Sequence, residues 1–217
     1  MNKKLITLMA LAVAQVTSVA LAQEPKTNAA VETKVAMCIG CHGIVGYQAT
    51  FPEIYKVPMI SGQGEKYIIE ALTVYKKGER KHPSMRGIAE SLSEKDMADV
   101  AAFYANKSSK KASAEQAKPS DEVQALLTKG NCTSCHGANF SKPINEAYPK
   151  IAGQHPDYLF VALKAYKSDG KSPVMGRNNA IMGGIAKQFT NNELKTLSKY
   201  IGSLSSDLEV TPESRFR

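Results

Sequence analysis

The four cysteines of this 217-residue chain form two pairs, and a histidine directly follows each pair. Cys38 and Cys41 precede His42, and Cys132 and Cys135 precede His136. Two cysteines three residues apart lie on the same side of a helical turn, so their sulfurs can bond to the two vinyl groups on one porphyrin edge. The adjacent histidine then lies beneath the iron as a proximal ligand. This pattern is the attachment signature of c-type haem.

Three other uses of paired cysteines fit the sequence less well. A thioredoxin-like dithiol needs a strand-to-helix context and does not require the histidine. A four-cysteine zinc site usually brings its pairs within roughly 15–20 residues, whereas 91 positions separate Cys41 from Cys132. A disulfide within either pair would close a very small loop. Two matching motifs therefore favour two covalent haem groups, and they use every cysteine of the chain.

The two motifs belong to an internal duplication. The Cys-x-x-Cys-His pattern returns after 94 residues, and the segment Met85-Arg86-Gly87-Ile88-Ala89 returns after 97 as Met182-Gly183-Gly184-Ile185-Ala186. A middle block returns after 91 residues, and its first members are Pro58, Gly62, Gln63, Tyr67, Leu72, Tyr75 and Lys76. Conserved order with short insertions indicates two copies of about 90 residues each.

The periodicity within each copy is helical. The apolar face of residues 67–75 predicts a helix that ends near Gly78. Ser93 with Asp96 and Thr190 with Glu193 resemble capping boxes that open a last helix in each copy. No convincing alternating strand pattern appears, so each copy is predicted to be all-α. A domain of this size has little core of its own, and a large apolar prosthetic group would supply one.

The chain begins with the pattern of a secretory signal. Residues 1–22 contain two early lysines, a mostly apolar run and then Ala20-Leu21-Ala22, which predicts cleavage before Gln23. An uncleaved anchor is the alternative, but polar residues interrupt the stretch, and a spanning helix needs roughly 20 apolar residues. We therefore expect an exported, periplasmic protein. The remaining chain is predicted to contain a first domain at 23–107, a linker at 108–120 and a second domain with a C-terminal tail at 121–217.

The sixth iron ligand distinguishes electron carriage from ligand chemistry, because methionine sulfur stabilises ferrous iron and an open position admits small molecules. Met85 precedes the last helix cap of its copy by eight residues, and Met182 has the same spacing. Met175 is a rival, since Pro173-Val174-Met175 resembles Pro83-Ser84-Met85. We favour Met182 because the block that follows it is longer. His82 and His155 lack a matching histidine in the other copy, and we interpret both as surface residues.

Taken together, the Cys-x-x-Cys-His, Pro-x-Ile-x-Gly-Gln and Met-x-Gly-Ile-Ala motifs resemble the dihaem cytochrome c4 family over nearly the whole exported chain. The resemblance implies two tandem class I cytochrome c domains, each wrapped around a covalently attached haem c. It implies haem attachment through the two cysteine pairs and His/Met ligation of both irons. The implied ligands are His42 with Met85 and His136 with Met182.

The resemblance also implies periplasmic electron transfer towards a terminal oxidase, with a quinol-oxidising complex as a possible donor. The alternative is a dihaem oxidoreductase, such as a peroxidase or sulfur-compound dehydrogenase, or the electron-accepting subunit of one. The formal net charge is +8 for the whole chain and falls to +6 without the two signal lysines. A basic charge is compatible with acidic protein partners or peripheral membrane association. No basic stripe indicates nucleic-acid binding, and nothing indicates a small-molecule substrate.

Overall fold

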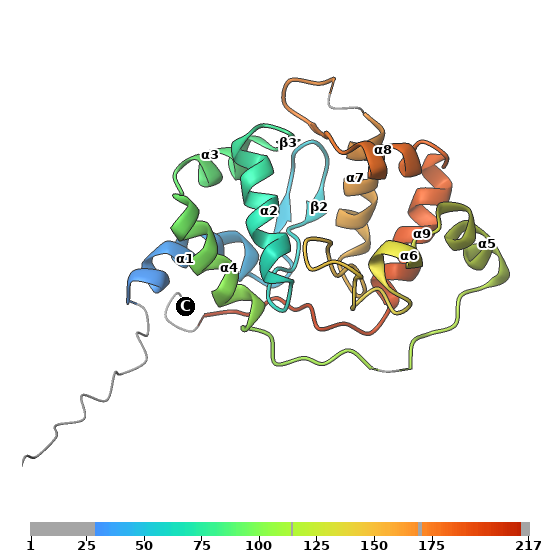
Figure 1. Cartoon of the computed structure of the whole chain (residues 1–217), viewed down its shortest axis with the longest axis horizontal. Coiled ribbons are helices and arrows are strands. Elements are labelled where there is room, and N and C mark those ends of the chain that lie inside the picture. The colour runs from blue at the N-terminus through green and yellow to red at the C-terminus, as the bar shows by residue number, and fades with distance from the viewer. Residues whose placement is uncertain (1–28, 114, 169–170, 214–217) are drawn as a thin grey trace, which may run out of the picture.

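Two helical lobes lie side by side in the computed structural model, which describes residues 29–113, 115–168 and 171–213 (Figure 1). The first lobe contains the helices α1 (Ala29–His42), α2 (Glu65–Lys76), α3 (Pro83–Glu90) and α4 (Glu94–Ala105). The second contains α5 (Asp121–Gly130), α6 (Thr133–His136), α7 (Pro156–Lys167), α8 (Ala180–Ala186) and α9 (Asn191–Ser203). The expected signal peptide at 1–22 lies outside the described residues. No helix within the described ranges is long and apolar enough to cross a membrane.

Each lobe has its own apolar core, as two copies of one small domain require. In the first lobe α2 and α4 pack together around Leu72, Met97 and Tyr104, which are almost fully buried. In the second lobe the core includes Leu194 and Leu197 of α9. Both expected capping boxes are present: the side chain of Ser93 accepts from Asp96 N–H, and that of Thr190 accepts from Glu193 N–H. The helical prediction is therefore confirmed.

The two lobes differ where the cysteine motifs begin. In the first lobe α1 continues through Cys38 and Cys41 to His42. In the second lobe α5 ends at Gly130, Asn131 adopts a left-handed conformation with φ of 46°, and α6 then carries Cys135 and His136. Asparagine accepts this conformation more readily than most residues. The same motif is thus presented by one continuous helix and by a broken one.

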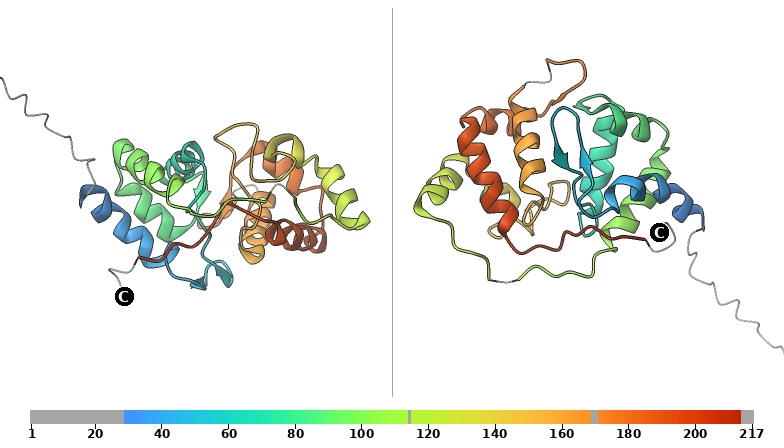
Figure 2. Two further views of the ribbon diagram at one scale, coloured as in Figure 1. Left: turned by 90° about the horizontal axis from the view of Figure 1, so that it is seen from below. Right: turned by 180° about the vertical axis from the view of Figure 1, so that it is seen from behind.

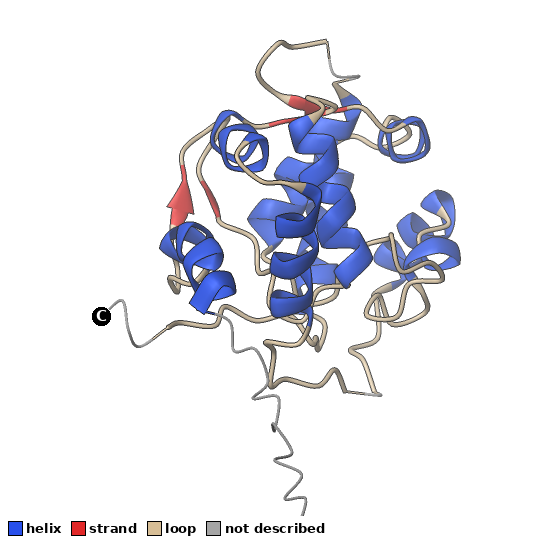
Figure 3. Cartoon of the chain, turned by 60° about the vertical axis from the view of Figure 1, so that its left-hand side comes forward, coloured by secondary structure: helices blue, strands red, loops and turns tan. Residues whose placement is uncertain are grey.

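Within the described ranges four strands of two residues each supplement the helices, and Figure 3 draws strands in red. β1 (Gln48–Ala49) pairs with β2 (Tyr55–Lys56) within the first lobe. β3 (Arg80–Lys81) belongs to the first lobe, and it pairs antiparallel with β4 (Gly176–Arg177) of the second. Strands this short have no room for an alternating pattern, so periodicity could not predict them. The β3–β4 pair joins the two lobes directly.

The end of the chain returns to the first lobe. After α9 the segment 204–213 runs beneath both lobes, as the views from below and behind also show (Figure 2). Glu209 N–H donates to Ser61 O at 3.2 Å, and the side chain of Leu208 is only 2% exposed. The expected linker lies along this segment, because Ala112 N–H donates to Asp207 Oδ1 at 2.6 Å. Linker and tail together therefore connect the lobes a second time.

Candidate haem sites

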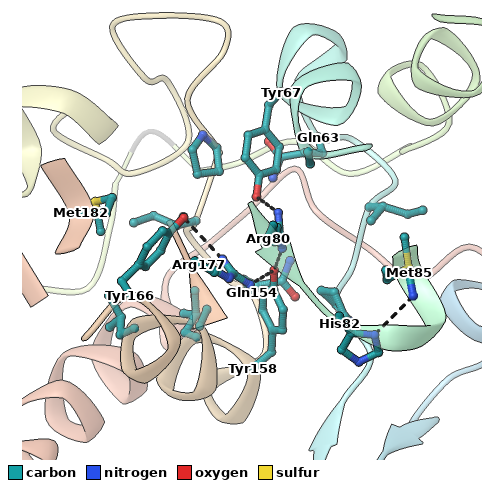
Figure 4. Close-up of a pocket in the computed structure, with 18 of the residues that line it drawn as sticks. Gln63, Tyr67, Arg80, His82, Met85, Gln154, Tyr158, Tyr166, Arg177 and Met182 are labelled. Atoms are coloured by element: carbon teal, nitrogen blue, oxygen red, sulfur yellow. Dashed lines mark hydrogen bonds between the residues drawn. The ribbon is translucent and has the colours of Figure 1, made fainter. Parts of the chain in front are cut away.

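One continuous cavity of about 700 Å³ reaches both cysteine motifs. Its wall contains both cysteine pairs and both adjacent histidines. Met85 and Met182 also line it, whereas Met175 is not among its lining residues and is 37% exposed. Figure 4 shows Met85 and Met182 on opposite sides of the space between the lobes. Thiols, imidazoles and thioethers in an apolar cavity are a donor set that suits haem c at each end.

Each motif histidine is held by the backbone of its own lobe. His42 Nδ1 donates to Pro58 O at 2.7 Å, and His136 Nδ1 donates to Pro149 O at 3.1 Å. A carbonyl oxygen only accepts, so the proton is on Nδ1 and the lone pair of Nε2 remains available to a metal. Burial lowers the pKa of both histidines. Both side chains are thus neutral and fixed in orientation, as iron ligands must be.

The two methionines occupy the same place in their helices. Met85 is the third residue of α3, and its N–H donates to Nδ1 of the capping residue His82 at 3.3 Å. Met182 is the third residue of α8, and its N–H donates to Oδ1 of the capping residue Asn179 at 2.9 Å. The surface position expected for His82 holds only in part. Its ring is half-buried and caps the helix that carries Met85.

The second histidine outside the motifs also differs from the expectation. His155 is half-buried at the start of α7, where it occupies the capping position without a side-chain hydrogen bond to the helix. Burial lowers its pKa, with a smaller opposing effect from Asp157. It is absent from the cavity wall among the described residues, so nothing connects it with iron ligation.

The cysteines are placed for attachment rather than for metal binding by thiolates. Burial raises the pKa of Cys38 to about 11 and also raises that of Cys132. These side chains are therefore neutral thiols. Within the described ranges no group of three or more His, Cys, Asp or Glu side chains is arranged to hold a metal ion. That result opposes the four-cysteine zinc site considered above.

Two arginines, the buried Arg80 and the partly buried Arg177, lie between the haem motifs. Arg80 Nη2 donates to the Tyr158 hydroxyl at 2.7 Å and Arg177 Nη2 donates to the same oxygen at 3.1 Å (Figure 4). Arg80 also donates to Tyr67, and Arg177 to Tyr166. The Arg80 side chain is 8% exposed and its Nε has no partner. Among the described residues neither arginine forms an ion pair with a carboxylate, so an anion suits this cluster.

The arginine cluster was missed from the sequence, although a signal for it exists. Arg80 and Arg177 are 97 residues apart, the same offset that relates Met85 to Met182. The tyrosines beside them were identified as repeated residues without a role. Extending the third repeated block upstream by five positions would have included both arginines. Their pairing across β3 and β4 depends on how the lobes dock, which a repeat alone does not specify.

Comparisons with known proteins agree with these features. The cytochrome c family profile matches residues 120–205. Cytochrome c4 of Azotobacter vinelandii is 31% identical over 222 aligned residues, covering 94% of this chain and all of the relative. A thiosulfate dehydrogenase electron acceptor of Thiomonas intermedia is 26% identical and covers 82% of this chain and 83% of its own. The crystal structure of reduced recombinant cytochrome c4 from Pseudomonas stutzeri superposes with a TM-score of 0.58 at 27% identity, covering 81% of this chain and 97% of that one.

The fold, the paired motifs and a relative matched over its whole length all lead to one conclusion. The expected class I cytochrome c fold is confirmed in both lobes, as is covalently bound haem c as the cofactor. The chain belongs to the cytochrome c4 family, whose members are dihaem c-type cytochromes of electron transfer.

Proposed function

We propose that this protein is an exported, periplasmic carrier that holds two haem c groups and passes electrons between respiratory proteins. Cys38 and Cys41 would attach one haem, with His42 and Met85 as its iron ligands. The second haem would be attached by Cys132 and Cys135 and ligated by His136 and Met182. The donor would be a quinol-oxidising complex and the acceptor a terminal oxidase. The signal pattern at 1–22 supports export.

The observation that carries this proposal is the repeated geometry around one cavity. In both lobes a neutral histidine faces the cavity from the cysteine motif, and a methionine faces it from the third position of a short capped helix. Met175 shares neither the helical position nor the cavity wall. A matched histidine–methionine pair in each lobe favours electron carriage over peroxidase chemistry. Peroxidase chemistry needs an iron with an open coordination position or an unusual ligand.

When bound, haem c supplies a one-electron ferric/ferrous couple at each iron. The proline carbonyls orient the histidines, and the helix caps hold the methionine backbone. Arg80 and Arg177 are suited to neutralise the haem propionates, because both line the cavity wall and neither forms an ion pair with a carboxylate in the described part of the chain. Both arginines lie between the lobes, so their charges would act on both haems.

A second candidate function concerns only the partner. Some relatives are named as electron acceptors of thiosulfate dehydrogenase. In that case the two haems and their ligands remain as above, and a sulfur-compound dehydrogenase replaces the quinol-oxidising complex as donor. Reduction of the purified protein by such a dehydrogenase with its substrate, compared with reduction by a quinol-oxidising complex, distinguishes the two.

The ligand assignment is tested by the weak far-red absorption band of a methionine–ferric bond. The purified protein should contain two haems per chain by pyridine haemochrome, with a far-red intensity that corresponds to two such bonds. Met182→Ala should halve this band, and the control Met175→Ala should leave it unchanged. The opposite result would show that Met175 is the ligand. Rapid carbon monoxide binding by the unsubstituted protein would contradict closed ligation at both irons.

A further inference from the structure

The two glutamines of the repeated Pro-x-Ile-x-Gly-Gln motif cross from one lobe to the other. Gln154 of the second lobe accepts from Met59 N–H and donates to Met59 O, both at 2.9 Å. Gln63 of the first lobe accepts from Lys150 N–H and donates to Lys150 O, again both at 2.9 Å. The side chains of Gln63 and Gln154 are 4% and 3% exposed. Each glutamine therefore binds a single residue of the opposite lobe through both of its amide atoms.

The residue that each glutamine binds directly follows the proline that holds a haem histidine. The N–H of Met59 and the C=O of Pro58 belong to one peptide group, and that C=O accepts from His42 Nδ1 at 2.7 Å. An unbroken hydrogen-bond chain thus runs from Gln154 Oε1 through this peptide group to His42. The reciprocal chain runs from Gln63 Oε1 through the Pro149–Lys150 peptide group to His136.

The backbone of its own lobe also holds each glutamine side chain. Oε1 of Gln63 also accepts from Gly64 N–H at 2.9 Å, and Oε1 of Gln154 also accepts from His155 N–H at 3.0 Å. The glycine before each glutamine has a positive φ, 84° at Gly62 and 67° at Gly153. These contacts orient each side chain from its own backbone. The cross-lobe bonds consequently cost little additional side-chain ordering.

We propose that Gln63 and Gln154 are crossed positioning residues, each tuning the haem iron of the opposite lobe through its proximal histidine. This inference rests on the proposed ligation by His42 and His136. Bonds in a chain polarise one another, so a peptide group whose N–H is bound has a more strongly accepting C=O. That C=O strengthens the hydrogen bond that it accepts from Nδ1–H and makes the imidazole more electron-donating. A more donating ligand stabilises ferric iron and lowers the reduction potential.

The sharpest test replaces Gln154 with methionine. Methionine has nearly the same shape but forms neither of the two hydrogen bonds that Gln154 makes to Met59. At the wild-type midpoint potential, the ferrous/ferric ratio of the first-lobe haem should rise at least threefold, equal to about 28 mV for a one-electron couple at 59 mV per tenfold. The reduction potential of the second-lobe haem should shift by less than half of this amount. Gln63→Met should produce the reverse pattern. Redox titration followed by the hyperfine-shifted haem methyl resonances in NMR measures each haem separately.

The matched control is Gln124→Met, the same change at an exposed position of α5 whose side chain bonds within its own helix. This control should change the reduction potential of neither haem. Solvent exchange of the histidine Nδ1–H in the reduced protein gives a second readout. Gln154→Met should speed exchange at His42 and not at His136, and Gln154→Glu should restore protection because a carboxyl oxygen again accepts from Met59 N–H.

Equal shifts at both haems in each variant would overturn the proposal, since loosening of the interface alone predicts that result. A larger shift at the haem of the substituted lobe would overturn it as well. If Gln154→Met does not assemble two haems, Gln154→Glu replaces it, with a larger downward shift expected at the first-lobe haem than at the second. The haemochrome and the far-red intensity of the unsubstituted protein distinguish failure of this inference from failure of the proposed function. Fewer than two haems, or fewer than two methionine–iron bonds, in that protein would refute the proposed function itself.

Discussion

His82 and Asn179 occupy the same capping position in the two lobes, so the lobes should respond differently to acid. Both side chains accept the N–H of the methionine three residues later. An asparagine oxygen accepts at every pH, but the Nδ1 of a histidine accepts only while it is unprotonated. Burial, followed by the charges of Arg80 and Arg177, lowers the pKa of His82. The folded protein therefore keeps this ring neutral.

His82→Asn should make stability less sensitive to acid. The unfolded chain binds a proton at His82 near the ordinary pKa of about 6.5, while the folded chain binds it only at lower pH. The free energy of unfolding consequently falls as pH decreases below about 6.5. His82→Asn removes the contribution of His82 to this fall. At pH 7 the variant should differ by less than about 0.5 kcal/mol, because asparagine is among the best capping residues. Thermal unfolding of the reduced protein at pH 7 and pH 5 measures both effects, and an unchanged difference between the two pH values would contradict the prediction.

Among the structural elements, the turns before the crossing glutamines impose a strict demand on residue type. A Cβ added at Gly153 would lie 2.4 Å from the Cβ of Ser206 and 2.9 Å from the carbonyl oxygen of Leu204, at a φ of 67°. The C-terminal segment therefore approaches this turn as closely as a glycine permits. Gly62 meets the same segment, because its added Cβ would lie 2.2 Å from Asp207 O.

Gly153→Ala should destabilise the protein by roughly 2 kcal/mol or more, since left-handed strain costs about 1–2 kcal/mol and the tail must also move. The control is Gly184→Ala in α8, where an added Cβ has no atom within 4 Å. That change should stabilise by roughly 0.5–1 kcal/mol, because alanine is a better helix former than glycine. Denaturant unfolding of both variants measures the difference, and a neutral Gly153→Ala would show that the turn relaxes without cost.

The sequence predicted those elements whose signals are local. The capping residues Ser93 and Thr190 and the apolar face of α2 mark helices directly, and the cysteine motifs mark chemistry that needs a fixed spacing. The β3–β4 pair could not be predicted, because two residues carry no periodicity and their partners come from different lobes. The crossed glutamines appeared only as a repeated motif. Their role depends on the docking of two domains, which neither domain encodes alone.

At the scale of the whole molecule, the linker and the C-terminal segment form one layer that fastens the lobes. Asp207 is its centre: Oδ1 accepts from Ala112 N–H in the linker at 2.6 Å, and Oδ2 pairs with Lys150 Nζ at 3.0 Å. Lys150 Nζ also donates to Gly62 O in the first lobe at 2.8 Å. One carboxylate thus joins the linker, the second lobe and, through Lys150, the first lobe. This layer lies beside the peptide group that Gln63 binds.

Asp207→Ala should therefore loosen the linker without removing either haem. The linker contains the exposed trypsin sites Lys110 and Lys111, and Ala112 N–H next to them would lose its acceptor. A loss of about 1–2 kcal/mol of local stability corresponds to a roughly 5- to 30-fold larger open population. Limited trypsin digestion followed by mass spectrometry should show cleavage at these lysines faster by that factor. Glu115→Ala, which removes a carboxylate from the same linker, should leave the cleavage rate unchanged; equal acceleration in both variants would mean that linker charge, and not the Asp207 contact, protects these sites.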